Sequence, residues 1–418
     1  MLFSTKLVDD TRYYKASTKA QEPQMALFAY PVPKRMADRV AGINAYWCGT
    51  AKQCDNIGVM SYLLPDKKTY IYLTDEPNVI TFNPDTLAVG GYHKWNKDDL
   101  GIASLGVTHV LDDPTTGDMI GVLTAMGMHT TATFYRVKAE DVHQRIKIGD
   151  IPVSGTNYYH SFGMSKDYIL FPEQPITIDV GKMLQSAPMA KCFIMDFNSG
   201  NIKFHLMKIA DGSIETIESD HFGFIMHTGN LYQEGDNFIV DYEMTTKNAS
   251  PFDVFDMVGS VNNPDRSPVD TGSVFRRYTI NMVEKTINYR NIMAPALETV
   301  GFPIFNPTFR GVKHCFTYIT EIFIVAKNFS VVKIDHCNND KMTRWNEPGV
   351  YMSEPYFVDD PASDREDEGS IVMSVYDDKI QTNRFVIIQA SSMKTVSDTT
   401  LPLRLPMMLH STWYPTQA

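Results

Sequence analysis

The sequence lacks long hydrophobic runs, basic clusters and closely spaced cysteine pairs. No segment approaches the roughly 18 to 20 apolar residues that a membrane-spanning helix needs. Lys and Arg number 38 against 49 Asp and Glu, so the formal net charge is −11, and the basic residues are scattered along the chain. Because nucleic-acid binding normally requires a basic stripe or patch, the sequence argues against a nucleic-acid partner.

Cysteine is scarce, with five residues in 418 and no Cys-x-x-Cys pair, so neither a disulfide framework nor a thiolate zinc site is suggested. The first 15 residues contain neither a basic segment nor an apolar segment of the kind found in secretory signals. Together these absences predict a reducing, cytoplasmic location, where ferrous iron is also available. The five cysteines are Cys48, Cys54, Cys192, Cys315 and Cys337.

The chain is rich in short β-branched and aromatic runs separated by turn residues, which predicts many short strands. This pattern is typical of an all-β sandwich, barrel or propeller, and periodicity alone leaves these three open. Since no break in composition divides the chain, we expect residues 1–418 to form a single domain. The predicted strands are Tyr70–Leu73, Asn78–Phe82, Met119–Ala125, Tyr168–Phe171, Cys192–Asp196, Ile202–Leu206, Phe238–Tyr242, Arg277–Met282, Cys315–Val325, Ser330–Ile334, Ser370–Val375 and Arg384–Gln389.

Two segments depart from the strand pattern. Pro33–Asn44 has apolar residues at helical spacing and predicts a helix that packs on the β body, with a membrane-surface helix as the alternative. Asp359–Glu368 is strongly acidic and is most simply a solvated loop.

Four of the eleven histidines lie in or beside strand-like runs at widely separated points of the chain. Neutral imidazole offers a lone pair to a metal without first losing much proton, and it leaves the full charge of the metal in place. Four ligands on an octahedral ion leave two positions open, as an oxygenase requires. From these residues alone, four unrelated core histidines remain an equally valid interpretation. The four are His109, His160, His227 and His410.

Five motifs in order along the chain carry a resemblance to a known family. They are His109-x-x-x-Asp113-Pro-x-x-Gly117; Tyr159-His160-Ser-Phe-Gly163; His227-x-x-Asn230-x-Tyr232; Ser353-Glu354-Pro355, followed by Glu366-Asp-Glu-Gly369; and Arg404-x-Pro406-x-x-x-His410-x-Thr412-Trp413. In this order the chain resembles the carotenoid cleavage oxygenases. It is most similar to the animal branch, which holds the carotene oxygenases and the retinoid isomerohydrolase.

The resemblance implies a seven-bladed β-propeller with a cap of helices and loops on one face. It implies Fe²⁺ on the axis, held by His109, His160, His227 and His410, and a hydrophobic tunnel for a polyene beside the iron. Dioxygen would be the second substrate, and no side-chain acid, base or nucleophile is required.

The resemblance also implies three glutamates that accept the second ring N–H of ligand histidines. Glu354 matches one of them. The second falls on Asp75 by simple register or on Glu76 after a shift of one residue. The third position, directly before Phe302-Pro303, is Gly301, and Glu298 is the nearest substitute.

Two further departures from the family concern the N-terminus and the membrane. Relatives carry several dozen residues before the point where this chain begins, so we expect an N-terminally truncated propeller with an incomplete first blade. The Pro-Asp-Pro-Cys-Lys element of the animal members corresponds to Tyr30-Pro-Val-Pro-Lys34, which has no cysteine to lipidate. Transient, peripheral contact with a membrane surface stays open.

The leading hypothesis is an iron-dependent, carotenoid 15,15'-dioxygenase-like enzyme that cleaves a carotenoid or apocarotenoid to retinal-type aldehydes, by central cleavage. Two alternatives remain. One is a retinoid isomerohydrolase, which consumes no oxygen. The other is a non-catalytic, lipid-binding or vestigial propeller, for which Gly301 and the short N-terminus are the motives.

Overall fold

In the computed structural model, the described residues are 19, 59–75, 77–96, 100, 105–125, 130–154, 158–179, 181–182, 192–195, 200–247, 272–294, 299–323, 328–405 and 410–414. The chain divides into two compact units. The first comprises 1–160, 175–199 and 207–214, and the second comprises 161–174, 200–206 and 215–418. Among the described residues, no helix has both the length and the apolar character needed to cross a membrane.

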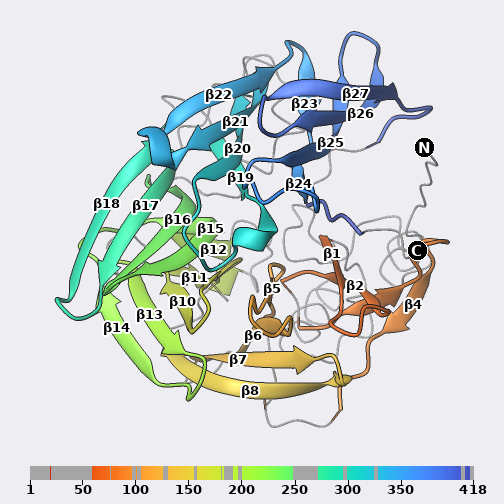
Figure 1. The fold of residues 1–418 in the computed structure, drawn as a ribbon. Coiled ribbons are helices and arrows are strands. Elements are labelled where there is room, and N and C mark those ends of the chain that lie inside the picture. Colours follow the sequence, from red (N-terminus) through yellow and green to blue (C-terminus); the bar gives the residue numbers. More distant parts are fainter. Residues whose placement is uncertain are drawn as a thin grey trace. The chain divides into compact units, whose positions relative to one another are not determined.

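The first unit contains two four-stranded antiparallel sheets and a two-stranded one (Figure 1). In one sheet the order is β1 (Met60–Leu63), β2 (Tyr70–Leu73), β3 (Ile80–Phe82) and β4 (Val89–Tyr92). In the next it is β5 (Leu111–Asp112), β6 (Met119–Ala125), β7 (Thr130–Lys138) and β8 (Asp141–Val153). The small sheet pairs β11 (Ile176–Ile178) with β12 (Phe193–Met195).

The second unit contains four sheets of the same kind. Their strands, in spatial order, are as follows. The first holds β14 (Ile214–Glu218), β13 (Lys203–Lys208), β10 (Tyr168–Glu173) and β9 (Gly163–Met164), of which a few end residues belong to the first unit. The second holds β15 (Phe224–Glu234), β16 (Asn237–Thr245), β17 (Ser273–Asn281) and β18 (Thr286–Met293). The third holds β19 (Thr299–Ile304), β20 (Phe316–Phe323), β21 (Asn328–Asp335) and β22 (Lys341–Asn346). The fourth holds β23 (Val350–Met352), β25 (Gly369–Asp377), β26 (Thr382–Gln389) and β27 (Lys394–Thr400), with β24 (Tyr356–Asp359) paired to β25.

An antiparallel meander of four strands is the blade of a β-propeller, so the described residues have the all-β propeller fold that the sequence predicts. They supply six such sheets, and the seventh expected blade is therefore not confirmed. Helices are nearly absent from the described ranges: the two bounded there are the short 3₁₀ turns η2 (Pro307–Phe309) and η3 (His336–Asn338). The expected helical cap is thus not seen in this part of the chain, and the predicted helix Pro33–Asn44 lies outside the described residues.

The sequence patterns that predict strands correspond to strands in the structure. Tyr70–Leu73 and Met119–Ala125 match β2 and β6 at both ends, and the described residues of the other predicted runs overlap strands. The turns behave as their chemistry requires. Gly117, with φ of 73°, and Gly235, with φ of 59°, adopt left-handed conformations that a side chain would disfavour.

The core of the second unit is formed between neighbouring sheets. One cluster joins residues of β10 and β13 to those of β15–β17, and a second joins β19–β22 to β23–β26. Tyr242 and Tyr278 are among the fully buried side chains of the first cluster. Burying a large apolar side chain contributes about 1.5–3 kcal/mol, so these interfaces hold adjacent blades in register.

The acidic segment Asp359–Glu368 is only partly the solvated loop that the sequence suggests. Its first half is mostly exposed, but Asp367 is 8% exposed and accepts from Lys333 Nζ at 2.8 Å. Glu366 accepts the backbone N–H groups of Cys315 and Phe316 at 2.6–2.9 Å. The expectation is therefore wrong for these two carboxylates, which attach the loop to β20 and β21.

A disulfide between Cys315 and Cys337 contradicts the expectation that the cysteines play no structural part. Cys315 directly precedes β20 and Cys337 lies in η3, just after β21, so the bond closes the open end of the β20–β21 hairpin. Sequence alone does not reveal this pairing, because the two residues are separated by 22 positions and meet only through strand register. Disulfides are rare in reducing compartments, so the cytoplasmic location stays a prediction.

Replacing both cysteines, in Cys315→Ser/Cys337→Ser, should lower the free energy of unfolding by about 3 kcal/mol, because closing a loop of this length restricts the unfolded chain. Urea denaturation followed by circular dichroism measures the change. Dithiothreitol should destabilise the wild type and a Cys192→Ala control but not the double variant. Equal urea midpoints for the wild type and the double variant would count against a stabilising disulfide.

Candidate metal centre

The first unit brings two of the predicted histidines together. His109 stands just before the turn that begins at Asp113, and His160 is the last residue of the first long segment of this unit. Asp113 Oδ1 accepts from Thr115 N at 2.8 Å and so fixes the turn. His109 Nε2 and His160 Nε2 lie 3.1 Å apart. Two ligands at right angles on one metal, with bonds of about 2.1 Å, would be separated by about 3 Å.

Asp75 is the carboxylate partner of His160. Its Oδ2 lies 2.8 Å from His160 Nδ1 and accepts from Tyr158 Oη at 2.7 Å, while its Oδ1 accepts from Thr108 N at 2.9 Å and from Thr108 Oγ1 at 2.7 Å. Burial alone would raise the pKa of Asp75, but nearby His160 and these hydrogen bonds lower it. The carboxylate is therefore held as an anion, which directs the Nδ1 proton of His160 toward it and leaves Nε2 bare. Of the two alternatives from sequence, Asp75 makes this contact, and Glu76 lies outside the described residues.

The second unit brings the other two histidines together. His227 lies on β15 and His410 follows the last strand, and their ring centroids are 5.3 Å apart in an edge-to-face arrangement. The ring of Phe302 packs against both imidazoles, with centroid distances of 5.3 Å and 5.8 Å. An apolar side chain thus covers part of this pair.

Glu354 is the partner of His410, as the resemblance implies. Its Oε2 lies 3.1 Å from His410 Nδ1 and accepts from Ser411 N at 2.9 Å, and its carbonyl oxygen accepts from Ser411 Oγ at 3.1 Å. One residue therefore fixes both the backbone beside His410 and the orientation of its ring.

Glu243 is the partner of His227, and sequence reasoning missed it. It lies on β16 directly opposite His227 in the strand register, and its Oε2 is hydrogen-bonded to His227 Nδ1. The expected position, Gly301, has no side chain, and the suggested substitute Glu298 lies outside the described residues. The available signal was cross-strand pairing across the turn at Gly235, which would align these two residues.

The donor set fits a divalent transition metal. Three imidazoles, those of His160, His227 and His410, have Nδ1 beside a carboxylate, so Nε2 is the atom left to ligate. Imidazole ligands with open positions suit iron, zinc and copper, and the residues alone do not select among them.

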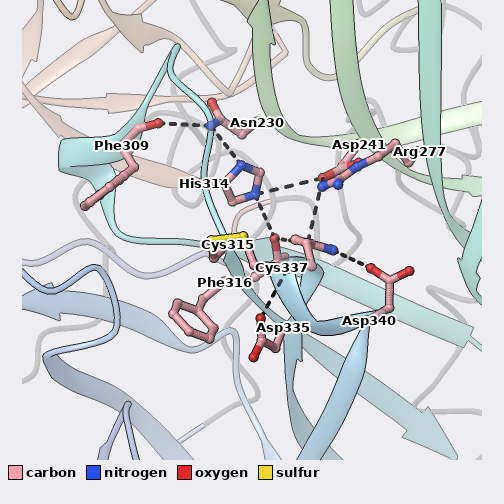
Figure 2. A network of polar contacts seen from close by, with 12 residues as sticks. Asn230, Asp241, Arg277, Phe309, His314, Cys315, Phe316, Asp335, Cys337 and Asp340 are labelled. Carbon is pink, nitrogen blue, oxygen red and sulfur yellow. Dashed lines mark hydrogen bonds and ion pairs between the residues drawn. A yellow bond between two sulfur atoms is a disulfide. The ribbon is translucent and has the colours of Figure 1, made fainter. Parts of the chain in front are cut away.

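A second group of ligating side chains lies wholly in the second unit, where Asp241, His314 and His336 converge. Both oxygens of Asp241 are bound by Arg277, at 2.7 Å each, and Nε2 of each histidine lies 3.9 Å from Asp241 Oδ2. Figure 2 shows His314 between Asn230 and the Asp241–Arg277 pair, close to the disulfide. Arg277 already neutralises the one carboxylate of the group.

Hydrogen bonding assigns the proton positions in this group. Asn230 Oδ1 accepts from Gly311 N at 3.0 Å, which turns its Nδ2 toward His314 Nδ1 at 3.2 Å. His314 Nδ1 must therefore accept, and its Nε2–H donates to Thr317 Oγ1 at 3.1 Å. The chain continues from Thr317 to His336 Nε2 at 3.0 Å, and from His336 Nδ1 to Asp340 at 2.8 Å. Because His314 Nε2 carries a proton, this group is a structural hydrogen-bond network and does not fit a metal.

Comparison with known proteins points to one family. The family described as retinal pigment epithelial membrane protein matches residues 2–415. The human mitochondrial carotenoid-cleaving dioxygenase is 24% identical over 300 residues, which cover 62% of this chain and 51% of that protein. The apocarotenoid-15,15'-oxygenase of Synechocystis is 22% identical over 264 residues, covering 62% and 52%. These matches span about half the length of either relative.

Solved structures agree on the fold. A cobalt-substituted Synechocystis apocarotenoid oxygenase superimposes with a TM-score of 0.78 at 18% identity, over 97% of this chain and 83% of that chain. A chimera built from that oxygenase and a retinal pigment epithelial protein gives 0.78 at 17% identity, over 97% and 83%.

The network around His314 should make stability depend on pH. Burial lowers the pKa of His314 to about 4, whereas an unfolded histidine titrates near 6.5. As the pH falls from about 6.5 to 4 only the unfolded chain takes up this proton, so stability should fall by up to about 3 kcal/mol and then level off. A His314→Asn variant should have a flatter pH profile in this window, and His143→Asn, which removes an exposed histidine, should not. An NMR titration of the His314 ring with a midpoint near 6.5 would contradict the assignment.

Proposed function

The chain belongs to the retinal pigment epithelial membrane protein family, which includes the carotenoid cleavage oxygenases, and on that premise we propose that it is an Fe²⁺-dependent oxygenase. Its substrate would be a carotenoid or apocarotenoid, cleaved at one double bond to aldehydes of the retinal type. The relatives' names supply the substrate class. Because the matches span about half of those relatives, the activity is a proposal for the whole protein.

We take the two histidine pairs to form one four-histidine site, and the observation that carries this assignment is the position of Ser161. This residue directly follows His160 in the chain. Its Oγ donates to Met226 O at 2.9 Å and lies 3.0 Å from Thr228 Oγ1. Met226 and Thr228 flank His227 on both sides. A peptide bond therefore links one ligand histidine to a residue that is hydrogen-bonded beside another.

The side chains around the histidines would orient them. Asp75, Glu243 and Glu354 would each hold one Nδ1 proton and so keep one Nε2 lone pair turned toward the metal. Bound Fe²⁺ would supply the binding and activation of dioxygen. Phe302, packed on the His227 and His410 rings, would exclude water from that side.

The alternative of a non-catalytic propeller loses one of its motives. It rests partly on Gly301, where the carboxylate partner of a ligand histidine was missing. Glu243 makes that hydrogen bond from the neighbouring sheet. The isomerohydrolase alternative is tested by oxygen: cleavage consumes it and yields two carbonyl products, whereas isomerisation does neither.

The protein loaded anaerobically with Fe²⁺ and then exposed to air should convert β-carotene or an apocarotenal to shorter aldehydes, with matching oxygen uptake. His227→Ala should lose both iron retention and cleavage, because one ligand is removed. His143→Ala, which replaces an exposed histidine, is the control and should retain both. Chromatography of the aldehydes and iron analysis after gel filtration measure the outcome, and cleavage at the wild-type rate by His227→Ala would refute its role as a ligand.

Asp75→Asn tests the orientation of His160. An amide cannot stabilise the Nδ1–H tautomer as an anion does, so metal affinity should fall roughly 10- to 100-fold. Glu76→Gln, a charge change of the same size at the adjacent position, should leave affinity within about twofold of the wild type. Competition with a chromogenic chelator gives both values. The converse result, with Glu76→Gln as the weaker binder, would reverse the assignment.

A further inference from the structure

Gly301 lies where a side chain would meet the carboxylate of Glu243. A Cβ added to Gly301 would stand 3.5 Å from Glu243 Oε1 and 3.6 Å from its Cδ. The φ of Gly301 is outside the left-handed region, so its backbone does not demand glycine. The residue is small because the adjoining space is filled by Glu243.

The Glu243 carboxylate makes two contacts from this space. Glu243 and His227 are direct cross-strand neighbours on β16 and β15, and Oε2 is hydrogen-bonded to His227 Nδ1. Oε2 also accepts from the backbone N–H of Phe302, at 3.2 Å. Phe302 has φ of 55° and sits in the register shift of β19 between Gly301 and Ile304. The carboxylate thus binds an N–H at an irregular point of the neighbouring sheet.

The geometry points to Glu243 and Gly301 as an exchanged pair: residues 243 and 301 are alternative carriers of one carboxylate that orients His227, and only one of them can hold it at a time. This inference rests on the proposed function and deepens it. Glu243 is a positioning residue, because it acts on a metal through His227. Two carboxylates in this space would repel each other at about 4 Å, where the interaction of like charges is strong.

The test uses four proteins: the wild type, Glu243→Ala, Gly301→Glu, and the double variant Glu243→Ala/Gly301→Glu. Each is titrated with Co²⁺ in competition with a chelator. Glu243→Ala should weaken binding roughly 10- to 100-fold because His227 loses the anion at Nδ1. Gly301→Glu alone should also weaken binding, through crowding and like charge. The double variant should recover to within a few-fold of the wild type.

Two further variants separate orientation from folding. Glu321→Ala removes a buried carboxylate of β20 that is paired with Arg344 at 2.9 Å, and it should leave Co²⁺ affinity unchanged. Glu243→Gln keeps an acceptor oxygen without the charge and should give an intermediate affinity. Thermal unfolding of every variant identifies any loss of affinity that merely reflects unfolding.

A readout in the metal-free protein separates this inference from the proposed function. Long-range ¹⁵N–¹H NMR of ring-labelled histidine reports which nitrogen carries the proton. His227 should be the Nδ1–H tautomer in the wild type and in the double variant, and should lose that preference in Glu243→Ala. If no variant or wild type retains metal, the proposed function fails while this measurement still decides the inference.

Two results would overturn the exchange. One is an unchanged His227 tautomer in Glu243→Ala. The other is a double variant that folds but binds Co²⁺ no better than Glu243→Ala, since residue 301 would then be unable to carry the carboxylate.

Discussion

The hydrogen bond between an imidazole Nδ1–H and a buried carboxylate is the interaction on which the candidate centre depends. It occurs three times, at His160, His227 and His410, and each time it fixes which nitrogen is free to bind a metal. Each carboxylate is itself held by other hydrogen bonds: Asp75 by Thr108 and Tyr158, Glu243 by the N–H of Phe302, and Glu354 by the N–H of Ser411. The surrounding sheets therefore act on the centre mainly by positioning these anions.

The inner strands could be predicted from sequence and the outer ones could not. β2, β6, β16 and β25 carry alternating or continuous apolar residues because both of their faces pack against neighbours. The last strand of most sheets is different: β18 is largely exposed and β27 is exposed at every residue, so their sequences show no apolar period. These strands are held by ladder hydrogen bonds to an inner neighbour, which leaves little trace in composition.

The candidate site shows the same division. The four histidines and Glu354 stand in motifs of contiguous residues and could be identified from sequence, whereas Glu243 could not, because its relation to His227 is a matter of strand register. A shift of one residue separates Asp75 from Glu76, and only the contact to His160 favours the first. The Cys315–Cys337 pair and the His314–Thr317–His336 chain also join residues through register between β20 and β21.

The acidic loop after β24 has an uneven tolerance to engineering. Residues 360–365 are mostly exposed, whereas Glu366 and Asp367 bind the start of β20 and the Lys333 ammonium of β21. A peptide tag or a small reporter domain can therefore enter the first stretch while the sheets stay joined. The same insertion two or three residues later would separate the anions from their donors and detach one blade from the next.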